Sequence, residues 1–199
     1  MEPRRLFLIA LAATLLLVSS LLGSFPKVYA ETFGNTSTSG MGAWSGTSAW
    51  VYFARFATPA SSGSLESISF YVSNPSGNGN VGIYADSSGS LGSLLAEGTS
   101  KQLQSGWNTF SSLSASVSIA ASTGYWLAFQ MQGGSFYYGG SGLRGWGPAS
   151  CCSMPTAISV AGMAAGSYAI YATYTTGPDF SISASPTSQS VGAGSTASY

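Results

Sequence analysis

Histidine is absent from the sequence, and charged residues are rare. Asp, Glu, Lys and Arg together make up 6% of the 199 residues, against about 25% in an average soluble domain. Without histidine the chain lacks the commonest general base and the commonest transition-metal ligand. Beyond residue 30 it keeps only three bases and five acids. So few bases neutralise few phosphates, and we expect no binding to nucleic acid.

The remaining ionisable residues give little support to catalysis. Glycoside hydrolysis requires two carboxylates about 5–10 Å apart, but the acids are spread over predicted turns, strand edges and domain ends: Glu31, Glu66, Asp86, Glu97 and Asp179. Lys101 is the only lysine beyond residue 30, and no spacing indicates a serine paired with it. A structural calcium held mostly by backbone carbonyls stays an open alternative. We therefore expect no catalytic residue, no cofactor and no enzymatic activity.

The first 30 residues have the pattern of a signal peptide. Arg4 and Arg5 precede an apolar run over residues 6–22, Pro26 ends any helix, and residues 28–30 place small side chains at a cleavage site. The alternative is an uncleaved anchor helix, because the run approaches the ~18 residues that span a bilayer. Either interpretation predicts an extracellular or cell-surface domain, with membrane contact only through this segment.

Apolar and polar side chains alternate with a period of two between residues 31 and 176, which is the spacing of half-buried strands. The clearest case is NVGIYAD at residues 80–86, which is followed by turn composition at residues 86–89 and a second apolar segment. Residues 49–57 are apolar on both faces, which predicts a central strand covered on both sides.

Turn residues divide this region into short segments. We expect turns at residues 74–79 and 133–134, and an irregular stretch over residues 139–155. Helical spacing over ten residues occurs nowhere outside the N-terminal segment. About nine short strands, with a turn roughly every 8–12 residues, predict one all-β domain over residues 31–176, an antiparallel β-sandwich of jelly-roll type.

Aromatic residues, 13% of the chain, suggest a binding surface. Flat aromatic faces can cover the apolar faces of sugar rings, and five residues in loops or at outward strand positions are candidates: Trp44, Tyr137, Tyr138, Arg144 and Trp146. Trp146 lies in the Gly-rich stretch SGLRGWGPAS, with Arg144 as a nearby donor. The alternative is that aromatic residues build the core, as we expect for Trp126, because long aliphatic side chains are scarce. The expected ligand is a polysaccharide or cell-surface glycan.

Two further local patterns predict covalent modification. Cys151 and Cys152 are the only cysteines, and after export they are expected to oxidise. A bond between these neighbours would form a rigid apolar knuckle beside Trp146, although their Cα atoms are closer than in most disulfides. Buried free thiols and bonds to another chain stay open alternatives. Asn35 begins an Asn-Thr-Ser sequon, so it is either a glycosylation site or a plain surface residue.

Three segments resemble a recurrent jelly-roll module of secreted bacterial and archaeal proteins: GIYADSSGSLGSLLAEG, SGWNTF and STGYWLAF. The residues that match its pattern are Tyr84, Asp86, Gly89, Leu94, Leu95, Trp107, Tyr125 and Trp126. The match spans most of residues 31–176, and Leu91 stands where many such modules have proline. The resemblance implies a carbohydrate-binding-like or anchor-associated domain with no fixed activity, and it carries over no catalytic residue.

The chain changes character after Gly177 and Pro178. The alternation in DFSISAS resembles the opening strands of immunoglobulin-like repeats in secreted bacterial and archaeal surface proteins. Two strands cannot bury a core. We therefore expect residues 177–199 to be a linker and the first strands of a repeat that continues beyond residue 199, with a disordered tail as the alternative.

Together these patterns predict a non-catalytic extracellular module for adhesion or glycan binding. Two other functions stay open. One is an accessory domain of a secreted hydrolase whose catalytic part lies outside this fragment. The other is a structural component of a surface layer or filament, which would leave an apolar edge strand open for a neighbouring chain.

Overall fold

The structure, a computed structural model, describes residues 28–177. Within this range every regular element is a β-strand and every strand pair is antiparallel, which confirms the predicted all-β class. The strands are β1 (Tyr29–Gly34), β2 (Gly42–Thr47), β3 (Trp50–Ala57), β4 (Gly63–Ser87), β5 (Ser90–Glu97), β6 (Lys101–Gln102), β7 (Gly106–Phe110), β8 (Ser118–Ile119), β9 (Gly124–Pro148), β10 (Gly162–Tyr168) and β11 (Ile170–Thr176). No helix long and apolar enough to cross a membrane occurs in these residues.

Several expectations concern the chain ends. The predicted signal helix and the predicted immunoglobulin-like strands fall on residues 1–27 and 178–199, outside the described residues. Val28–Thr176 forms one compact unit. Its first strand begins at Tyr29, so β1 includes two residues that the sequence assigned to the signal peptide, and Tyr29 pairs with Thr176 of β11.

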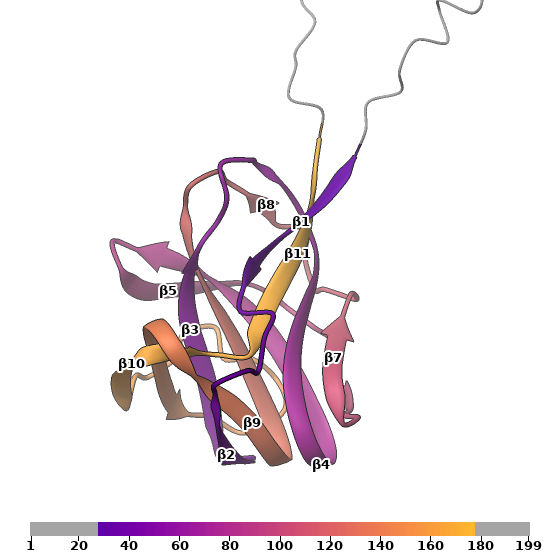
Figure 1. Ribbon diagram of the computed structural model, residues 1–199, viewed down its shortest axis with the longest axis vertical. Helices are drawn as coiled ribbons and strands as arrows, with labels where there is room; N and C mark the ends of the chain where they lie inside the picture. The colour runs from indigo at the N-terminus through magenta and orange to yellow at the C-terminus, as the bar shows by residue number, and fades with distance from the viewer. Residues whose placement is uncertain (1–27, 178–199) are drawn as a thin grey trace, which may run out of the picture. The chain divides into compact units, whose positions relative to one another are not determined.

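Two strands of 25 residues each, β4 and β9, organise the sheet. They pair with each other from Val72 opposite Phe136 to Ala85 opposite Tyr125. Strands β5, β6, β7, β8 and β11 also pair with β4, and β2, β3 and β10 pair with β9. Figure 1 shows the two long strands, magenta and orange, curving through the domain with the shorter strands around them.

Strands β4 and β9 fold back on themselves at the turns expected at residues 74–79 and 133–134, although their pairing continues through the bend (Figure 1). Phe129 and Phe136 lie on either side of residues 133–134 with ring centroids 5.3 Å apart, whereas seven residues of straight strand span about 23 Å. The register of β4 against β9 shifts between Ser73 and Gly79, where Asn74 (φ 49°) and Gly77 (φ 81°) adopt left-handed conformations. Extra residues at such points bulge and bend a strand, so β4 and β9 fold back together while they stay paired. The stretch expected to be irregular over residues 139–155 instead continues β9 as far as Pro148, so this prediction was wrong for residues 139–148.

The tight turn predicted after residue 86 is confirmed. Ser87 pairs with Ser90, so β4 and β5 are joined by a two-residue turn at Ser88 (φ 53°) and Gly89 (φ 86°). Two successive positive φ angles define a type I′ turn, whose twist matches that of the flanking strands. The backbone N–H of Gly89 donates to the Asp86 carboxylate at 3.0 Å, which closes the turn.

The Asp86 carboxylate also joins this hairpin to the interior. Arg55 donates to it through Nε at 2.6 Å and Nη2 at 2.9 Å, and the indole Nε1 of Trp126 donates at 3.0 Å. The hydrogen bonds from Arg55 are the main reason that the pKa of Asp86 falls from 3.8 to about 2. Trp126 is fully buried, as expected, so its indole N–H needs this acceptor inside the protein.

Alternate side chains of the strands enter two apolar clusters. The main cluster gathers residues from β1, β3, β4, β7, β9 and β11, among them Ile68, Phe70 and Leu127. The intervening residues of β3, β4 and β9 form a second cluster together with two residues of the segment 149–161 that covers it. Its buried members are Val51, Phe53, Tyr84, Trp126, Ala128, Met154 and Ile158. Strand β3 is therefore buried on both faces, as predicted.

Candidate functional site

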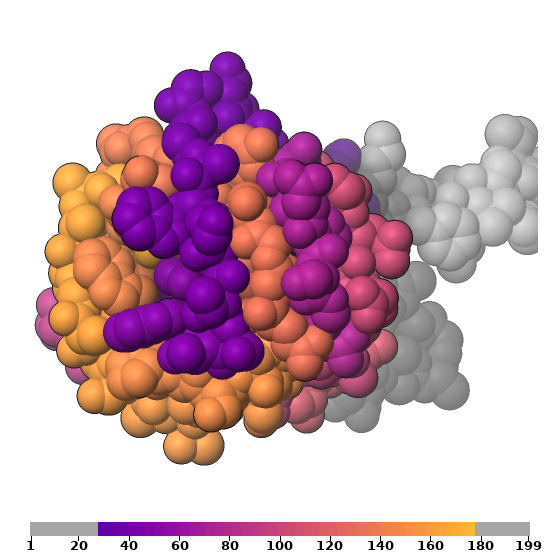
Figure 2. Space-filling model, turned by 90° about the horizontal axis from the view of Figure 1, so that it is seen from below, coloured from indigo at the N-terminus to yellow at the C-terminus, as the bar shows by residue number. Residues whose placement is uncertain are grey.

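Four strands enclose a hollow that is lined almost entirely by aromatic rings. It has a volume of about 400 Å³ and is bounded by residues of β2, β3, β9 and β10. We call it the aromatic hollow, and its lining residues are Trp44, Trp50, Tyr52, Phe136, Tyr138, Arg144, Trp146 and Tyr168. Figure 2 views the domain from the β2 end, where indigo residues of the N-terminal strands lie across orange residues of β9.

Strand β9 supplies half of this lining because it changes partners along its length. Residues 133–138 pair with β2, residues 138–146 with β10 and residues 143–148 with β3. Gly140 (φ 68°) and Gly142 (φ 120°) lie where the strand leaves β2, in backbone conformations that favour glycine. The Gly-rich composition of this stretch thus lets one strand contribute rings to two sides of the hollow.

The floor of the aromatic hollow consists of three buried rings. The centroids of Tyr52 and Phe136 lie 4.3 Å apart, and Tyr168 meets both rings edge-on at 5.9 and 5.5 Å. All three also belong to the main cluster. Burial raises the pKa of Tyr52 to about 12 and raises that of Tyr168 as well. Both phenols are therefore neutral at physiological pH.

The rim of the aromatic hollow is more open to solvent. Trp44 is 59% exposed, and its ring meets Tyr138 edge-on with centroids 6.1 Å apart. Trp146 is half-buried and lies against Gly162, its cross-strand neighbour in β10. A Cβ atom at position 162 would overlap the indole ring, so glycine leaves the space that this ring occupies.

Arg144 is the only charged residue in the lining. Its guanidinium carbon lies 4.5 Å from the ring centroid of Tyr138 and 5.6 Å from that of Tyr168, both within cation–π range. Its Nε donates to the carbonyl oxygen of Ala165 at 3.2 Å. These contacts with β9 and β10 hold the guanidinium group at one side of the hollow.

Four of the five predicted ligand-binding residues therefore meet at one place: Trp44, Tyr138, Arg144 and Trp146. Tyr137 does not line the hollow, because neighbouring residues of a strand point to opposite faces. Its ring instead packs against Tyr71, with centroids 5.2 Å apart. Sequence reasoning missed the rest of the lining: Trp50, Tyr52, Phe136 and Tyr168. Their alternation predicted strand residues, and nothing in it indicated that they border a hollow.

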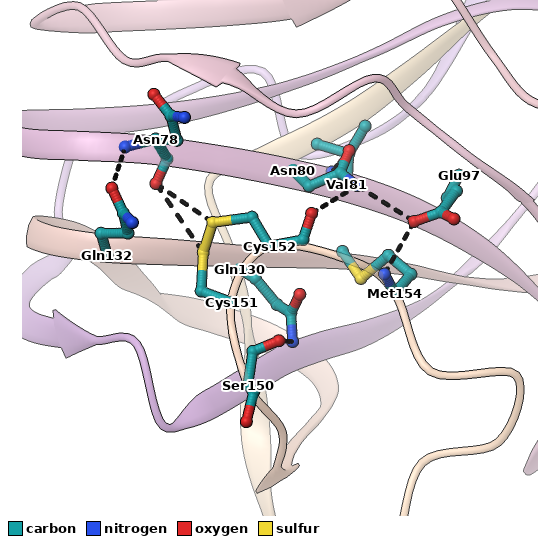
Figure 3. The surroundings of a disulfide bond; sticks show 10 residues. All are labelled: Asn78, Asn80, Val81, Glu97, Gln130, Gln132, Ser150, Cys151, Cys152 and Met154. Atoms are coloured by element: carbon teal, nitrogen blue, oxygen red, sulfur yellow. Dashed lines mark hydrogen bonds between the residues drawn. A yellow bond between two sulfur atoms is a disulfide. The ribbon is translucent and has the colours of Figure 1, made fainter.

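Cys151 and Cys152 are bonded to each other, and Figure 3 shows their surroundings. Their sulfur atoms lie 3.8 and 3.4 Å from the carbonyl oxygen of Asn78. Buried Asn80 donates to the carbonyl oxygen of Cys152 at 3.3 Å and to Glu97 at 3.1 Å. The same Glu97 oxygen accepts the backbone N–H of Met154 at 2.7 Å. This network fixes the segment that covers the second cluster.

The bond between Cys151 and Cys152, one of the alternatives that the sequence left open, lies in the segment whose residues Met154 and Ile158 belong to the second cluster. Gln130 donates to the carbonyl oxygen of Ser150 at 3.5 Å, which places the start of this segment on the Gln130 face of β9. The adjacent residue Phe129 points to the other face, where it stacks on Tyr52 in the hollow floor at 5.3 Å. The disulfide therefore belongs to the cover of the second cluster.

The Asn35 side chain is half-buried and already engaged. Its Nδ2 donates to the Ser167 hydroxyl at 3.2 Å, and its Oδ1 accepts the backbone N–H of Ser37 at 3.0 Å. A glycan on Nδ2 would compete with the bond to Ser167, which lies in β10. Asn35 thus acts in the structure as a link between the end of β1 and β10.

Residues 28–177 contain no group of three or more His, Cys, Asp or Glu side chains arranged to hold a metal ion. No protein-family model matches the chain, and no curated protein matches its sequence.

Proposed function

We propose that the domain is a non-catalytic, extracellular carbohydrate-binding module and that the aromatic hollow is its sugar site. The observation that carries the proposal is the meeting of four predicted ligand residues around one aromatic-lined space of about 400 Å³. That volume lies in the range of small-molecule sites, which are mostly apolar with a few placed polar groups.

The chemistry of the lining suits a sugar ring. A pyranose presents C–H bonds on its faces and hydroxyl groups at its edge. Trp44, Tyr138 and Trp146 supply flat apolar surfaces for the faces, and Arg144 supplies hydrogen-bond donors for the edge. Because the floor phenols are neutral, they add hydroxyl groups without adding charge.

We further propose that the domain is a β-sandwich of jelly-roll type. In support, residues from β1, β4, β7 and β11 face residues from β3 and β9 across one shared main cluster. The long bent strands β4 and β9 take part in the pairing on both sides of that cluster. Such an arrangement closes a sheet over its own core and leaves its ends free for binding sites.

The proposal is tested by screening the purified protein on a polysaccharide array, with bound ligands then quantified by titration calorimetry. Trp44→Ala removes a ring that is 59% exposed, so we expect at least about a 10-fold loss of affinity without loss of folding. Trp146→Ala should act in the same direction.

Trp107→Ala is the matched control, because Trp107 is a half-buried ring that packs on Tyr71 and Tyr171 and lies outside the hollow. Its affinity should equal that of the unaltered protein. An array without a single bound polysaccharide, or equal losses in all three variants, contradicts the proposed function.

A further inference from the structure

The aromatic hollow contains one charged group, Arg144, and no acid among residues 28–177 forms an ion pair with it. Resting on the proposed function, we propose that the hollow selects saccharides that carry an anionic oxygen group, a carboxylate or a sulfate, and that Arg144 binds this group. The inference names the ligand class of the site and assigns the residue that discriminates within it.

The guanidinium group of Arg144 is held in place but only partly used. Its face is covered by Tyr138 at 4.5 Å, and Nε donates to Ala165 at 3.2 Å. Burial raises the pKa of the Tyr168 phenol, and the interaction of the guanidinium group with this phenol partly opposes that rise. An arginine has five N–H donors in a planar fork, so about three stay available to a ligand in the hollow after the contacts with Ala165 and Tyr168. That fork matches the two oxygens of a carboxylate or sulfate.

No carboxylate of the described residues competes for this fork. Within residues 28–177 the acids are engaged elsewhere, and none lines the hollow: Glu31 with Tyr174, Glu66 with Thr175, Asp86 with Arg55, and Glu97 with Asn80 and Met154. An incoming anion therefore meets a positive group without a repelling neighbour.

The other two bases of the described residues are differently placed. Arg55 forms an ion pair with Asp86 at 2.6 Å, and Lys101 donates to the Thr109 carbonyl and lies 4.6 Å from the Phe110 ring centroid. Neither lines the aromatic hollow. Among residues 28–177, Arg144 is therefore the cation that lines the proposed sugar site and forms no ion pair with an acid of these residues.

The surroundings strengthen such a contact. The floor rings are buried and the rim is aromatic, so a bound anion would be partly shielded from water. Charge-assisted hydrogen bonds are stronger in such surroundings than in bulk solvent. Removing the guanidinium group should then lower the affinity for an anionic saccharide about 10- to 100-fold. The same reasoning predicts that added salt weakens this binding and leaves the binding of neutral saccharides nearly unchanged.

The test uses pairs of polysaccharides that differ only in charge, measured by titration calorimetry with the purified protein. One pair is polygalacturonate and its fully methyl-esterified form, and the other is a sulfated galactan and its desulfated form. We expect the unaltered protein to prefer the charged member of at least one pair, and the pair with the larger preference distinguishes carboxylate from sulfate. Arg144→Gln should abolish the preference, and Arg144→Lys should restore only part of it.

Lys101→Gln is the matched control for a general loss of positive charge, because Lys101 is exposed and lies outside the hollow. It should keep the preference. Equal binding of charged and neutral members, or a preference that survives in Arg144→Gln or disappears equally in Lys101→Gln, overturns this inference and leaves the proposed function standing. Absence of binding to every polysaccharide, charged or neutral, overturns the proposed function and this inference with it.

Discussion

Replacing Asp86 with asparagine should destabilise the domain by an amount that depends on pH. In the native protein the two carboxylate oxygens accept four hydrogen bonds, two from Arg55 and one each from Gly89 and Trp126. Asp86→Asn keeps the size of the side chain but turns one oxygen into an NH₂ group. Two of the four N–H donors then face this NH₂ group in place of an acceptor, so the substitution removes the negative charge and two hydrogen bonds.

The size of the effect follows from the pKa of Asp86, which falls from 3.8 to about 2. One pKa unit corresponds to about 1.4 kcal/mol, so the shift is equivalent to about 2 kcal/mol before solvent screening. The Arg55 side chain is 36% exposed, and screening of such a pair reduces this to roughly 1 kcal/mol. Adding the one hydrogen bond lost at buried Trp126, whose indole N–H keeps the Ser90 carbonyl oxygen at 3.2 Å, we expect Asp86→Asn to lower the free energy of unfolding by about 1–2 kcal/mol at pH 7.

The sign of the pH dependence is fixed by the direction of the shift. Because the folded-state pKa of Asp86 is depressed, its contribution is complete above the unfolded-state pKa near 3.8 and is lost as the pH falls toward 2. The difference in stability between the unaltered protein and Asp86→Asn should therefore shrink between pH 5 and pH 2. Urea unfolding followed by tryptophan fluorescence at pH 7, 5, 3 and 2 measures this difference.

Glu66→Gln is the matched control for this experiment. It makes the same chemical change at an exposed carboxylate that accepts only the Thr175 hydroxyl, at 2.9 Å. Its effect should stay within about 0.5 kcal/mol. A stability difference for Asp86→Asn that stays constant from pH 7 to pH 2, or a loss in Glu66→Gln of the same size, refutes the reasoning.

Two further predictions concern the disulfide and the buried tyrosines. The Cys151–Cys152 bond joins adjacent residues and closes no long loop. The double substitution Cys151→Ser and Cys152→Ser should therefore lower the melting temperature by only about 2–4 °C and leave glycan binding unchanged. A loss above about 10 °C in calorimetry contradicts this prediction. The pKa of Tyr52 and of Tyr174 is raised from 10.0 to about 12, chiefly by burial. The contribution of both tyrosines to stability is therefore complete below pH 10 and is lost between pH 10 and 12. Denaturant unfolding across this pH range measures the loss. Constant stability over the range is the contrary result.

Local sequence predicted those parts of the fold that are decided within a few residues. Ile68, Phe70 and Val72 alternate with polar neighbours and are all fully buried in the main cluster. Ser88 and Gly89 form the tight turn that the composition of residues 86–89 indicates. In both cases backbone preference and side-chain period act over a single strand or turn, so no distant partner is needed to decide the structure.

Sequence reasoning failed where a distant strand decides. The composition of residues 74–79 fits a reversing turn and a bulge equally well, since both use residues that tolerate positive φ. Strand β4 folds back here and still keeps its pairing with β9 on both sides of the bend, a combination that composition alone does not predict. The aromatic hollow is a consequence of the same long-range pairing, because Trp44 of β2 and Tyr168 of β10 reach Trp146 of β9 through the pairing of both strands with β9.

Binding and stability are separable at the rim of the hollow but not at its floor. Tyr52 and Tyr168 are buried members of the main cluster, so substitutions there would create cavities that cost several kcal/mol, about 3–5 for a large aromatic ring. Trp44 is largely exposed, and Arg144 contributes one hydrogen bond to a backbone carbonyl. Changes of ligand preference should therefore arise at the rim residues, since there a side chain can be exchanged while the core beneath it keeps its packing.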